Sequence, residues 1–438
     1  MPPTESPGSG RPNSVRRRPK TLFVLLCFEG PDQYSQAGGL GVRVKELARA
    51  LARLGHETHL FFAGDPALPA EESQGALHLH RWSQWISAFH PHGVYDGEEG
   101  KKLDWDSSLP PYVAERIVDP AQRAGFRIAA LAEDWQTADT LIGLDRELRR
   151  TGRRDRCVLL WNANNVFGNW RIDFPALEQA ATLTTVSRYM KFRMWEAGVN
   201  PLVVPNGIPR EAIADPPAEE VEALRKAAGG EPLLFKIGRF DPDKRWLMAV
   251  EAVAALKARG RRPRLLVRGG REPHGAEVLA RARALHLKHV DIRPGGNAAE
   301  LAAAIEAAPE DADVLNIAAF LPEQVLPSIY RAADAVVANS GHEPFGLVGL
   351  EVMAAGGLAV TGSTGEDYAE PFRNALVMET ADPLELAEGL ELLGRDRRLA
   401  GALRRGGRAT ARAFTWDRVI PQLFARLDYA GDKQGVDW

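Results

Sequence analysis

The chain has 438 residues, 45% of them hydrophobic and 26% charged, and we expect more than one hydrophobic core at this length. The formal net charge of −3 gives no electrostatic reason to expect binding to nucleic acid or to an anionic membrane. Only two cysteines occur, Cys27 and Cys157, which excludes a disulfide framework and suits the reducing cytoplasm, where we expect the protein to act. The longest apolar runs are too short for a membrane helix, so we expect no transmembrane segment.

The first elements predict a parallel α/β arrangement. Residues 1–20 are rich in Pro, Gly, Ser and Arg and lack apolar periodicity, which predicts a disordered tail. The run TLFVLLCFEG (21–30) predicts a strand that is buried on both faces. A glycine-rich loop follows, then a helical pattern that ends at Gly55, then a second strand in HETHLFFAG. A strand–helix–strand unit of this kind predicts parallel pairing.

Residues 82–115 interrupt the alternation, and their Trp, His, Tyr, Gly and Pro content predicts a loop excursion. Aromatic rings in such a loop suit stacking on sugars, and they equally suit a core beneath the loop. Regular alternation resumes near residue 124 and continues to VVPNGIP. A second alternation then begins, with strands expected at 233–238, 264–268, 313–317, 334–339 and 357–361. Helices are expected between them, at 244–258, 276–286, 298–308, 324–332 and 344–355.

This pattern predicts an α/β protein with two consecutive doubly wound sheets. We expect an N-terminal domain at 21–205, a C-terminal domain at 206–415, and a final helix at 416–438 that returns to the first domain. Ligands of such sheets bind outside the carboxyl ends of the strands, here in a cleft between the two domains.

The segment GHEPFGLVGLEVMAAGG (341–357) has two acids in an otherwise apolar helix, Glu343 and Glu351. A helix that begins at Pro344 offers unpaired N–H groups and a positive dipole end, which favours a bound anion. A carboxylate repels bare phosphate, so we expect the two acids to bind hydroxyl groups on either side of a diphosphate. The alternative is that Glu343 is a plain cap and Glu351 an exposed or ion-paired surface residue. The N–H groups concerned belong to Phe345, Gly346 and Leu347.

A second candidate is KIGRFDPDKRW (236–246), where a strand ends at Gly238 and two cations follow, Arg239 and Lys244. Cations at the carboxyl end of a strand suit a diphosphate. The alternative is that they are surface cations paired with Asp241 and Asp243.

A third candidate is GGLG (38–41), where Gly39 stands before a helix and offers bare backbone to a phosphate or a sugar. Its distance from the first strand does not match the dinucleotide-binding fingerprint, which argues against a dehydrogenase.

These pieces together resemble the GT-B glycosyltransferases, in particular retaining family 4, with the starch and glycogen synthases as close relatives. EPFGLVGLE is similar to the E-x7-E signature, and GRFDPDK to the Arg…Lys pair that neutralises a leaving diphosphate. GGLG…LARALARLGHE and VSRYMKFRMWEAGVNPLVVPNGIP are similar to the opening loop and helix and to the closing stretch of the first domain. The resemblance spans about residues 21–425, and the C-terminal motifs are its specific part.

The resemblance implies a GT-B fold and transfer of glucose or mannose, with retention, from a nucleoside diphosphate sugar to a hydroxyl acceptor on a sugar or polyol. It implies that Arg239, Lys244 and Glu343 are catalytic. It implies that no metal or other cofactor is required, and that the donor is a UDP-, GDP- or ADP-hexose, with UDP favoured. The implied donor-binding residues are Gly39, Gly238, Phe345, Gly346, Leu347 and Glu351.

One region departs from the family pattern. LAEDWQTA (131–138) is similar to a synthase segment that reads His-Asp-Trp, and Glu133 stands where the His is expected. WNANN (161–165) likewise replaces a segment that often carries His-Asn. The acceptor candidates are therefore Glu133, Asp134, Asn162 and Asn164. Two alternatives stay open, a nucleotide-sugar epimerase on the same fold and a sugar-binding homologue without catalysis. The E-x7-E pair favours transfer over the first, and the two cations favour catalysis over the second.

Overall fold

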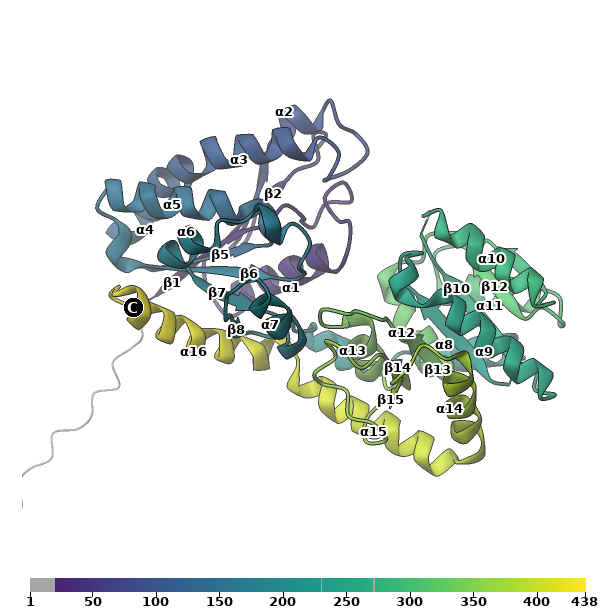
Figure 1. The fold of residues 1–438 in the computed structure, drawn as a ribbon. Helices are drawn as coiled ribbons and strands as arrows, with labels where there is room; N and C mark the ends of the chain where they lie inside the picture. The colour runs from purple at the N-terminus through teal and green to yellow at the C-terminus, as the bar shows by residue number, and fades with distance from the viewer. Residues whose placement is uncertain (1–19, 230, 271) are drawn as a thin grey trace, which may run out of the picture.

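The computed structural model describes residues 20–229, 231–270 and 272–438. The tail expected at 1–20 lies outside the described residues, apart from Lys20. Figure 1 shows two lobes, each built around one sheet, with the C-terminal helix lying along the first lobe. The expected α/β class with two doubly wound sheets is confirmed.

The first sheet has the strand order β3-β4-β2-β1-β5-β6-β7-β8, and every neighbouring pair is parallel except β3–β4. Its strands are β1 (Thr21–Leu26), β2 (Thr58–Ala63), β3 (Glu71–Gln74), β4 (Leu77–Trp82), β5 (Arg127–Glu133), β6 (Cys157–Ala163), β7 (Thr182–Thr185) and β8 (Leu202–Val203). The helices of this half are α1 (Gly39–Arg53), α2 (Gln84–Ser87), α3 (Glu98–Tyr112), α4 (Asp119–Arg123), α5 (Ala138–Arg150), α6 (Phe174–Ala180) and α7 (Arg188–Trp195). All six residues of β1 are buried, as expected for a central parallel strand covered on both faces.

The second sheet is parallel throughout, with the order β11-β12-β10-β9-β13-β14-β15. Its strands are β9 (Leu233–Ile237), β10 (Arg264–Arg268), β11 (His289–Ile292), β12 (Val314–Ile317), β13 (Ala335–Ala338), β14 (Ala359–Thr361) and β15 (Leu376–Val377). The remaining helices are α8 (Ala218–Ala228), α9 (Trp246–Ala258), α10 (His274–Ala284), α11 (Ala298–Glu306), α12 (Leu326–Ala332), α13 (Leu347–Ala354), α14 (Pro383–Arg395), α15 (Arg397–Ala413) and α16 (Trp416–Gln434).

Helix α16 belongs to the core of the first lobe although it ends the chain. Trp416, Val419 and Leu423 are buried in one apolar cluster with Phe23 of β1 and Leu47 of α1. Removing a side chain as large as Trp416 from such a core costs about 3–5 kcal/mol. The last helix therefore ties the second lobe to the first (Figure 1).

Two expectations about local structure were wrong. Residues 82–115 are not mainly a loop, because α3 occupies Glu98–Tyr112 and buries Trp105 and Leu109. Its weak amphipathicity and its Pro110–Pro111 pair hide the helix from periodicity analysis. Helix α13 begins at Leu347 and not at Pro344, because Gly346 has φ = 81°, a left-handed conformation that ends helical geometry on its N-terminal side. No helix in the described ranges is long and apolar enough to cross a membrane.

Candidate active site

The turn after β9 presents two cations at the carboxyl end of the second sheet. Arg239 is exposed, and its guanidinium has no ion-pair or hydrogen-bond partner among the described residues. Lys244 ends the short helical turn Pro242–Lys244, and its Nζ lies 2.6 Å from Oε2 of Glu343. A Cβ added at Gly238 would meet no atom within 4 Å, so the space beside this glycine is open. The cations therefore stand free of the turn's own acids.

The two acids of this turn, Asp241 and Asp243, accept hydrogen bonds from backbone amides instead. Oδ1 of Asp241 accepts the amide of Asp243 at 2.8 Å, and the carboxylate of Asp243 accepts the amide of His342 at 3.1 Å. The carbonyl of Asp243 also accepts the amide of Gly341 at 2.7 Å. The predicted alternative, in which Arg239 and Lys244 pair with Asp241 and Asp243, is thus absent from the described part of the chain. The result is a fixed connection between this turn and the loop that carries Glu343.

The start of α13 faces the same place. No group among the described residues accepts a hydrogen bond from the amides of Phe345, Gly346 and Leu347. Phe345 is buried against the rings of Tyr368 and Phe414, at centroid distances of 5.7 and 6.2 Å, so the backbone here is held from behind. Unpaired N–H groups at a helix start are a site for an anion.

The two acids of the apolar helix have different surroundings. Glu343 lies in the loop before α13, its side chain is 18% exposed, and its amide donates to Oγ1 of Thr364 at 2.9 Å. Glu351 lies within α13, half-buried, where the hydroxyl of Tyr330 donates to it at 3.3 Å. Burial raises the pKa of Glu351 to about 7. Glu343 is therefore paired with a cation, whereas Glu351 has only a neutral partner among the described residues.

Two further groups at this end were not identified from the sequence. Lys236 of β9 is buried behind the cationic turn, where its Nζ donates to Oδ1 of Asn339 at 2.6 Å. Burial, followed by repulsion from Lys244 and Arg245, holds its pKa well below the ordinary range. Glu366 is buried against the start of α13, and burial, followed by the charge of Glu343, raises its pKa to about 8. Buried positions in the strand and loop hid both residues from a search for exposed polar motifs.

The four acceptor candidates converge at the carboxyl ends of β5 and β6. Glu133 is 1% exposed, and both of its oxygens lie 3.3 Å from Nε of Arg43 on α1. The amide groups of Asn162 and Asn164 donate to its Oε2 at 2.8 and 2.7 Å. Arg43 also contacts Oδ1 of Asn206. Glu133 is thus neutralised and fully hydrogen-bonded inside the lobe, which is the condition for burying a carboxylate.

Asp134 is buried beside this pair in an unusual conformation. Its φ of 60° and ψ of 176° lie in a region that is nearly confined to glycine, and such outliers cluster at functional sites. Its oxygens accept the backbone amide of Asn164 at 2.7 Å and the side-chain amide of Asn165 at 2.8 Å. Burial, followed by the charges of Glu133 and Glu29, raises its pKa to about 7.

Glu29 is the main residue of the first lobe that sequence reasoning missed. Its buried Oε2 accepts the amides of Ala37, Gly38 and Gly41 at 3.2, 2.9 and 2.9 Å, and so occupies the N-terminus of α1. The hydroxyl of Tyr95 donates to Oε1 at 2.6 Å. A carboxylate from within the chain therefore accepts two of the four amides of the GGLG loop, those of Gly38 and Gly41. A glutamate nine residues before a glycine loop leaves no recognised sequence signal.

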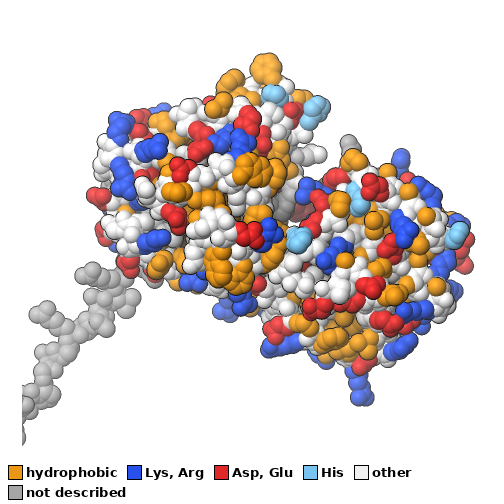
Figure 2. All heavy atoms as spheres, in the orientation of Figure 1, with side chains coloured by type: hydrophobic (Ala, Val, Ile, Leu, Met, Phe, Trp, Pro, Cys, Tyr) orange, Lys and Arg blue, Asp and Glu red, His pale blue; other side chains and the backbone are white. Residues whose placement is uncertain are grey.

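The two lobes meet across this site. Gly39 is exposed at the first position of α1, and a Cβ placed there would lie 3.8 Å from Cδ1 of Leu347 in α13. Nearby, the amide of Arg188 donates to Asp367 at 2.7 Å. The hydroxyl of Tyr189 lies 3.1 Å from Nδ1 of His342. Figure 2 shows a notch between the lobes on the side that is viewed. The two cations and the open amides of the second lobe thus face the surface of the first lobe that carries Glu133 and Asp134.

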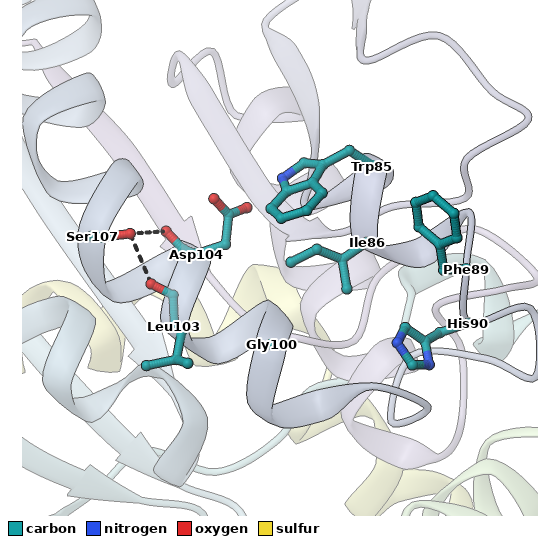
Figure 3. Close-up of a pocket in the computed structure, with 8 residues that line it drawn as sticks. All are labelled: Trp85, Ile86, Phe89, His90, Gly100, Leu103, Asp104 and Ser107. Atoms are coloured by element: carbon teal, nitrogen blue, oxygen red, sulfur yellow. Dashed lines mark hydrogen bonds between the residues drawn. The ribbon is translucent and has the colours of Figure 1, made fainter.

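The aromatic residues of 82–112 form a separate feature. A pocket of about 580 Å³ lies between α2 and α3. Figure 3 shows its lining, which includes the exposed side chains of Trp85, Phe89 and Leu103. Trp105 is buried in the core instead. The core placement predicted for part of these aromatic side chains is therefore confirmed at Trp105, and sugar stacking on the exposed rings stays a prediction.

Residues 219–410 match the family described as glycosyl transferases group 1. A D-inositol 3-phosphate glycosyltransferase of Nocardia farcinica is 30% identical over 462 residues, which cover 96% of this chain and 93% of that protein.

Solved structures show the same fold. A sucrose-phosphate synthase from Thermosynechococcus elongatus superposes with a TM-score of 0.67 at 19% identity and covers 94% of this chain and 100% of that one. The catalytic domain of starch synthase IV from Arabidopsis thaliana, bound to ADP and acarbose, superposes with a TM-score of 0.65 at 16% identity and covers 94% and 99%.

Proposed function

The chain belongs to the group 1 glycosyltransferases of GT-B fold, which are related to the starch synthases, and from this membership we propose a specific reaction. It is the transfer of a hexose from a nucleoside diphosphate sugar, with UDP-hexose the favoured donor, to a hydroxyl group of a sugar or polyol. The configuration at the anomeric carbon is retained, and no metal ion is needed.

The observation that carries the proposal is the joint position of Lys244, Glu343 and the start of α13. Lys244 and Glu343 are in contact at 2.6 Å, and the exposed Arg239 belongs to the same turn as Lys244. The open amides at Phe345–Leu347 add a second set of donors that needs no side-chain charge. Together they fit a diphosphate whose negative charge grows as the bond to the sugar breaks. Two cations and a helix start supply the positive charge that a metal ion supplies elsewhere.

In the proposed mechanism, the bond between the anomeric carbon and the diphosphate oxygen breaks while the acceptor oxygen attacks from the same face. The acceptor hydroxyl gives its proton to the leaving phosphate oxygen, so no side chain has to act as base. Arg239 and Lys244 stabilise the leaving diphosphate. Glu343, neutralised by Lys244, accepts hydrogen bonds from sugar hydroxyl groups, and Glu351 binds the ribose hydroxyl pair.

The acceptor enters from the first lobe in this proposal. Carboxylate and amide groups at the ends of β5 and β6 are suited to hydroxyl groups, which both donate and accept hydrogen bonds. Asp134 supports this role because of its conformation and its place beside Asn164 and Asn165. Glu133 has its acceptor capacity taken by Arg43, Asn162 and Asn164, so we assign it to holding the cluster in place.

The test is calorimetric titration of the full chain with UDP, GDP, ADP and NAD, first with a chelator and then with magnesium. We expect one nucleoside diphosphate to bind tightly with the chelator present and NAD not to bind. Binding of NAD alone, or of no nucleotide, would overturn the proposal. The matching nucleoside diphosphate hexose is then used as donor, and the anomeric configuration of the glycosidic bond in the product is determined by proton NMR. A signal of inverted configuration would overturn retention.

A further inference from the structure

A second concave site lies at the opposite end of the second sheet. It has a volume of about 610 Å³, within the range of small-molecule sites. Its lining includes Leu233 at the start of β9 and Ala335 at the start of β13, together with side chains of α8, α9, α14 and α15. The cationic turn and Asn339 follow the other ends of these same two strands. The pocket is therefore separate from the donor site and connected to it through β9 and β13.

Arginine dominates the polar lining of this pocket. Its five arginines are Arg225 on α8, Arg261 and Arg262 in the loop before β10, and Arg397 and Arg404 on α15. Three carboxylates accompany them, and the only pocket arginine with which they form ion pairs among the described residues is Arg397. Glu231 and Asp334 both pair with Arg397, at 2.6 and 3.7 Å. Glu391 pairs with Arg259 and Arg395, neither of which lines the pocket.

Four of the arginines consequently have no carboxylate partner among the described residues. Arg225 and Arg404 donate only to backbone carbonyls, those of Arg331, Ala332, Ala333, Asp334 and Gly356. Arg261 and Arg262 are exposed, and their guanidinium groups have no hydrogen-bond partner in the described part of the chain. Burial and the nearby positive charges of Arg225, Arg331 and Arg397 lower the pKa of Arg404 to about 10, which reflects like-charge crowding.

We propose that this arginine pocket is a binding site for a phosphate ester, distinct from the proposed donor and acceptor sites. Arginine presents a planar fork of donors that matches phosphate oxygens, and two such forks here are unoccupied by protein groups. A phosphate would also offset the repulsion among the crowded guanidinium groups. Apart from the arginines and the three carboxylates, the lining is mainly apolar, with Leu233, Leu256 and Leu390 buried at its walls, and suits the carbon skeleton of the ester.

The arginines of this pocket differ in their contacts with the rest of the protein. Arg225 and Arg404 donate hydrogen bonds to carbonyl groups at the end of α12 and just before β13. They therefore add positive charge to the pocket and also stabilise the local fold. Arg261 and Arg262 make no such contact and have no structural duty that the described residues reveal. Replacing these two therefore removes ligand contacts without removing packing.

The experiment uses inorganic phosphate as the probe and the unfolding temperature of the full chain as the readout, at constant ionic strength set with sodium chloride. Four proteins are compared: the unmodified chain, the double variant Arg261→Ala with Arg262→Ala, the donor-site variant Lys244→Ala, and Arg405→Ala. Arg405 is an exposed arginine of α15 that does not line the pocket, and it serves as the matched control.

We expect phosphate to raise the unfolding temperature of the unmodified chain, of Lys244→Ala and of Arg405→Ala by similar amounts. In the double variant the apparent affinity should fall by about tenfold or more, because charge-assisted contacts are lost. Equal protection of the double variant and the unmodified chain would overturn the proposal, as would no protection of the unmodified chain. Loss of protection only in Lys244→Ala would assign the phosphate to the donor site instead. If the double variant does not fold, Arg262→Glu alone replaces it, with the same expected loss.

Discussion

Replacing Lys244 with alanine tests the proposed chemistry most directly. The side chain of Lys244 is 29% exposed, and its only polar partner among the described residues is Glu343, at 2.6 Å. The substitution leaves the carboxylate of Glu343, itself 18% exposed, without its counter-charge and removes one of the two cations from the diphosphate site. Stability and catalysis are therefore affected by different amounts.

The two magnitudes can be separated. A partly exposed ion pair is worth about 0–1 kcal/mol, so the variant should remain folded with a small loss of stability. A charged group that acts mainly on the transition state is worth about 2.7–4 kcal/mol, which corresponds to a loss of about 10²–10³ in kcat. The catalytic effect thus exceeds the stability effect by several fold in free energy.

The assay measures initial rates of nucleoside diphosphate release at saturating donor, together with a denaturation curve for each protein. Lys257→Ala is the matched control, because Lys257 pairs with Asp313 at the same distance of 2.6 Å but belongs to α9 outside the site. We expect the control to keep its rate. A folded Lys244→Ala protein with a near-normal kcat would refute the role given to this residue, and an equal loss in Lys257→Ala would point to stability as the cause.

Three other substitutions have defined outcomes. Glu133→Ala should cost about 3–5 kcal/mol of unfolding free energy, because it leaves Arg43 buried without its carboxylate; a loss below about 1 kcal/mol in denaturant titration would contradict this. Glu366→Gln should gain stability relative to the unmodified chain as pH rises. The pKa of Glu366 is raised to about 8 in the folded protein, so the protonated acid contributes fully to the free energy of unfolding below the ordinary pKa of glutamate. This contribution is lost as pH rises through 8. Unfolding curves of the two proteins with parallel pH dependence would refute the assignment. Gly346→Ala should lower both stability and donor affinity, since its Cβ would lie 2.6 Å from Cγ of Glu366 at a positive φ; calorimetry showing unchanged affinity would contradict it.

The residues of the proposed donor site could be singled out from the sequence because its parts are local. Arg239 and Lys244 follow one strand within a few residues, and Glu343 and Glu351 belong to one loop and its helix. The sheet order then brings the ends of β9 and β13 together, since these two strands are neighbours. Parallel topology alone was enough to predict that these motifs would meet.

The first lobe was less predictable because its contacts join distant segments. Arg43 and Glu133 are separated by 90 positions, and no local pattern shows that they form a buried pair. The role of Glu29 could not be predicted from the sequence either, because backbone amides donate to it and every sequence has such amides. In α3, Pro110 and Pro111 lie inside a helix whose burial of Trp105 outweighs their poor propensity. Tertiary packing decided each of these cases.

In the proposed complex, the charge of the two facing surfaces favours one orientation of the nucleotide sugar. The second lobe offers Arg239, Lys244 and the open start of α13, so the diphosphate is attracted there. The first lobe also brings a helix start to the cleft, that of α1, but there the buried carboxylate of Glu29 accepts the amides of Gly38 and Gly41, and Arg43 is neutralised by Glu133. The negative charge of Glu29 makes this helix start less favourable for a phosphate than that of α13. In the proposed complex, the sugar of a donor held at α13 is therefore directed towards the hydroxyl-binding groups of the first lobe.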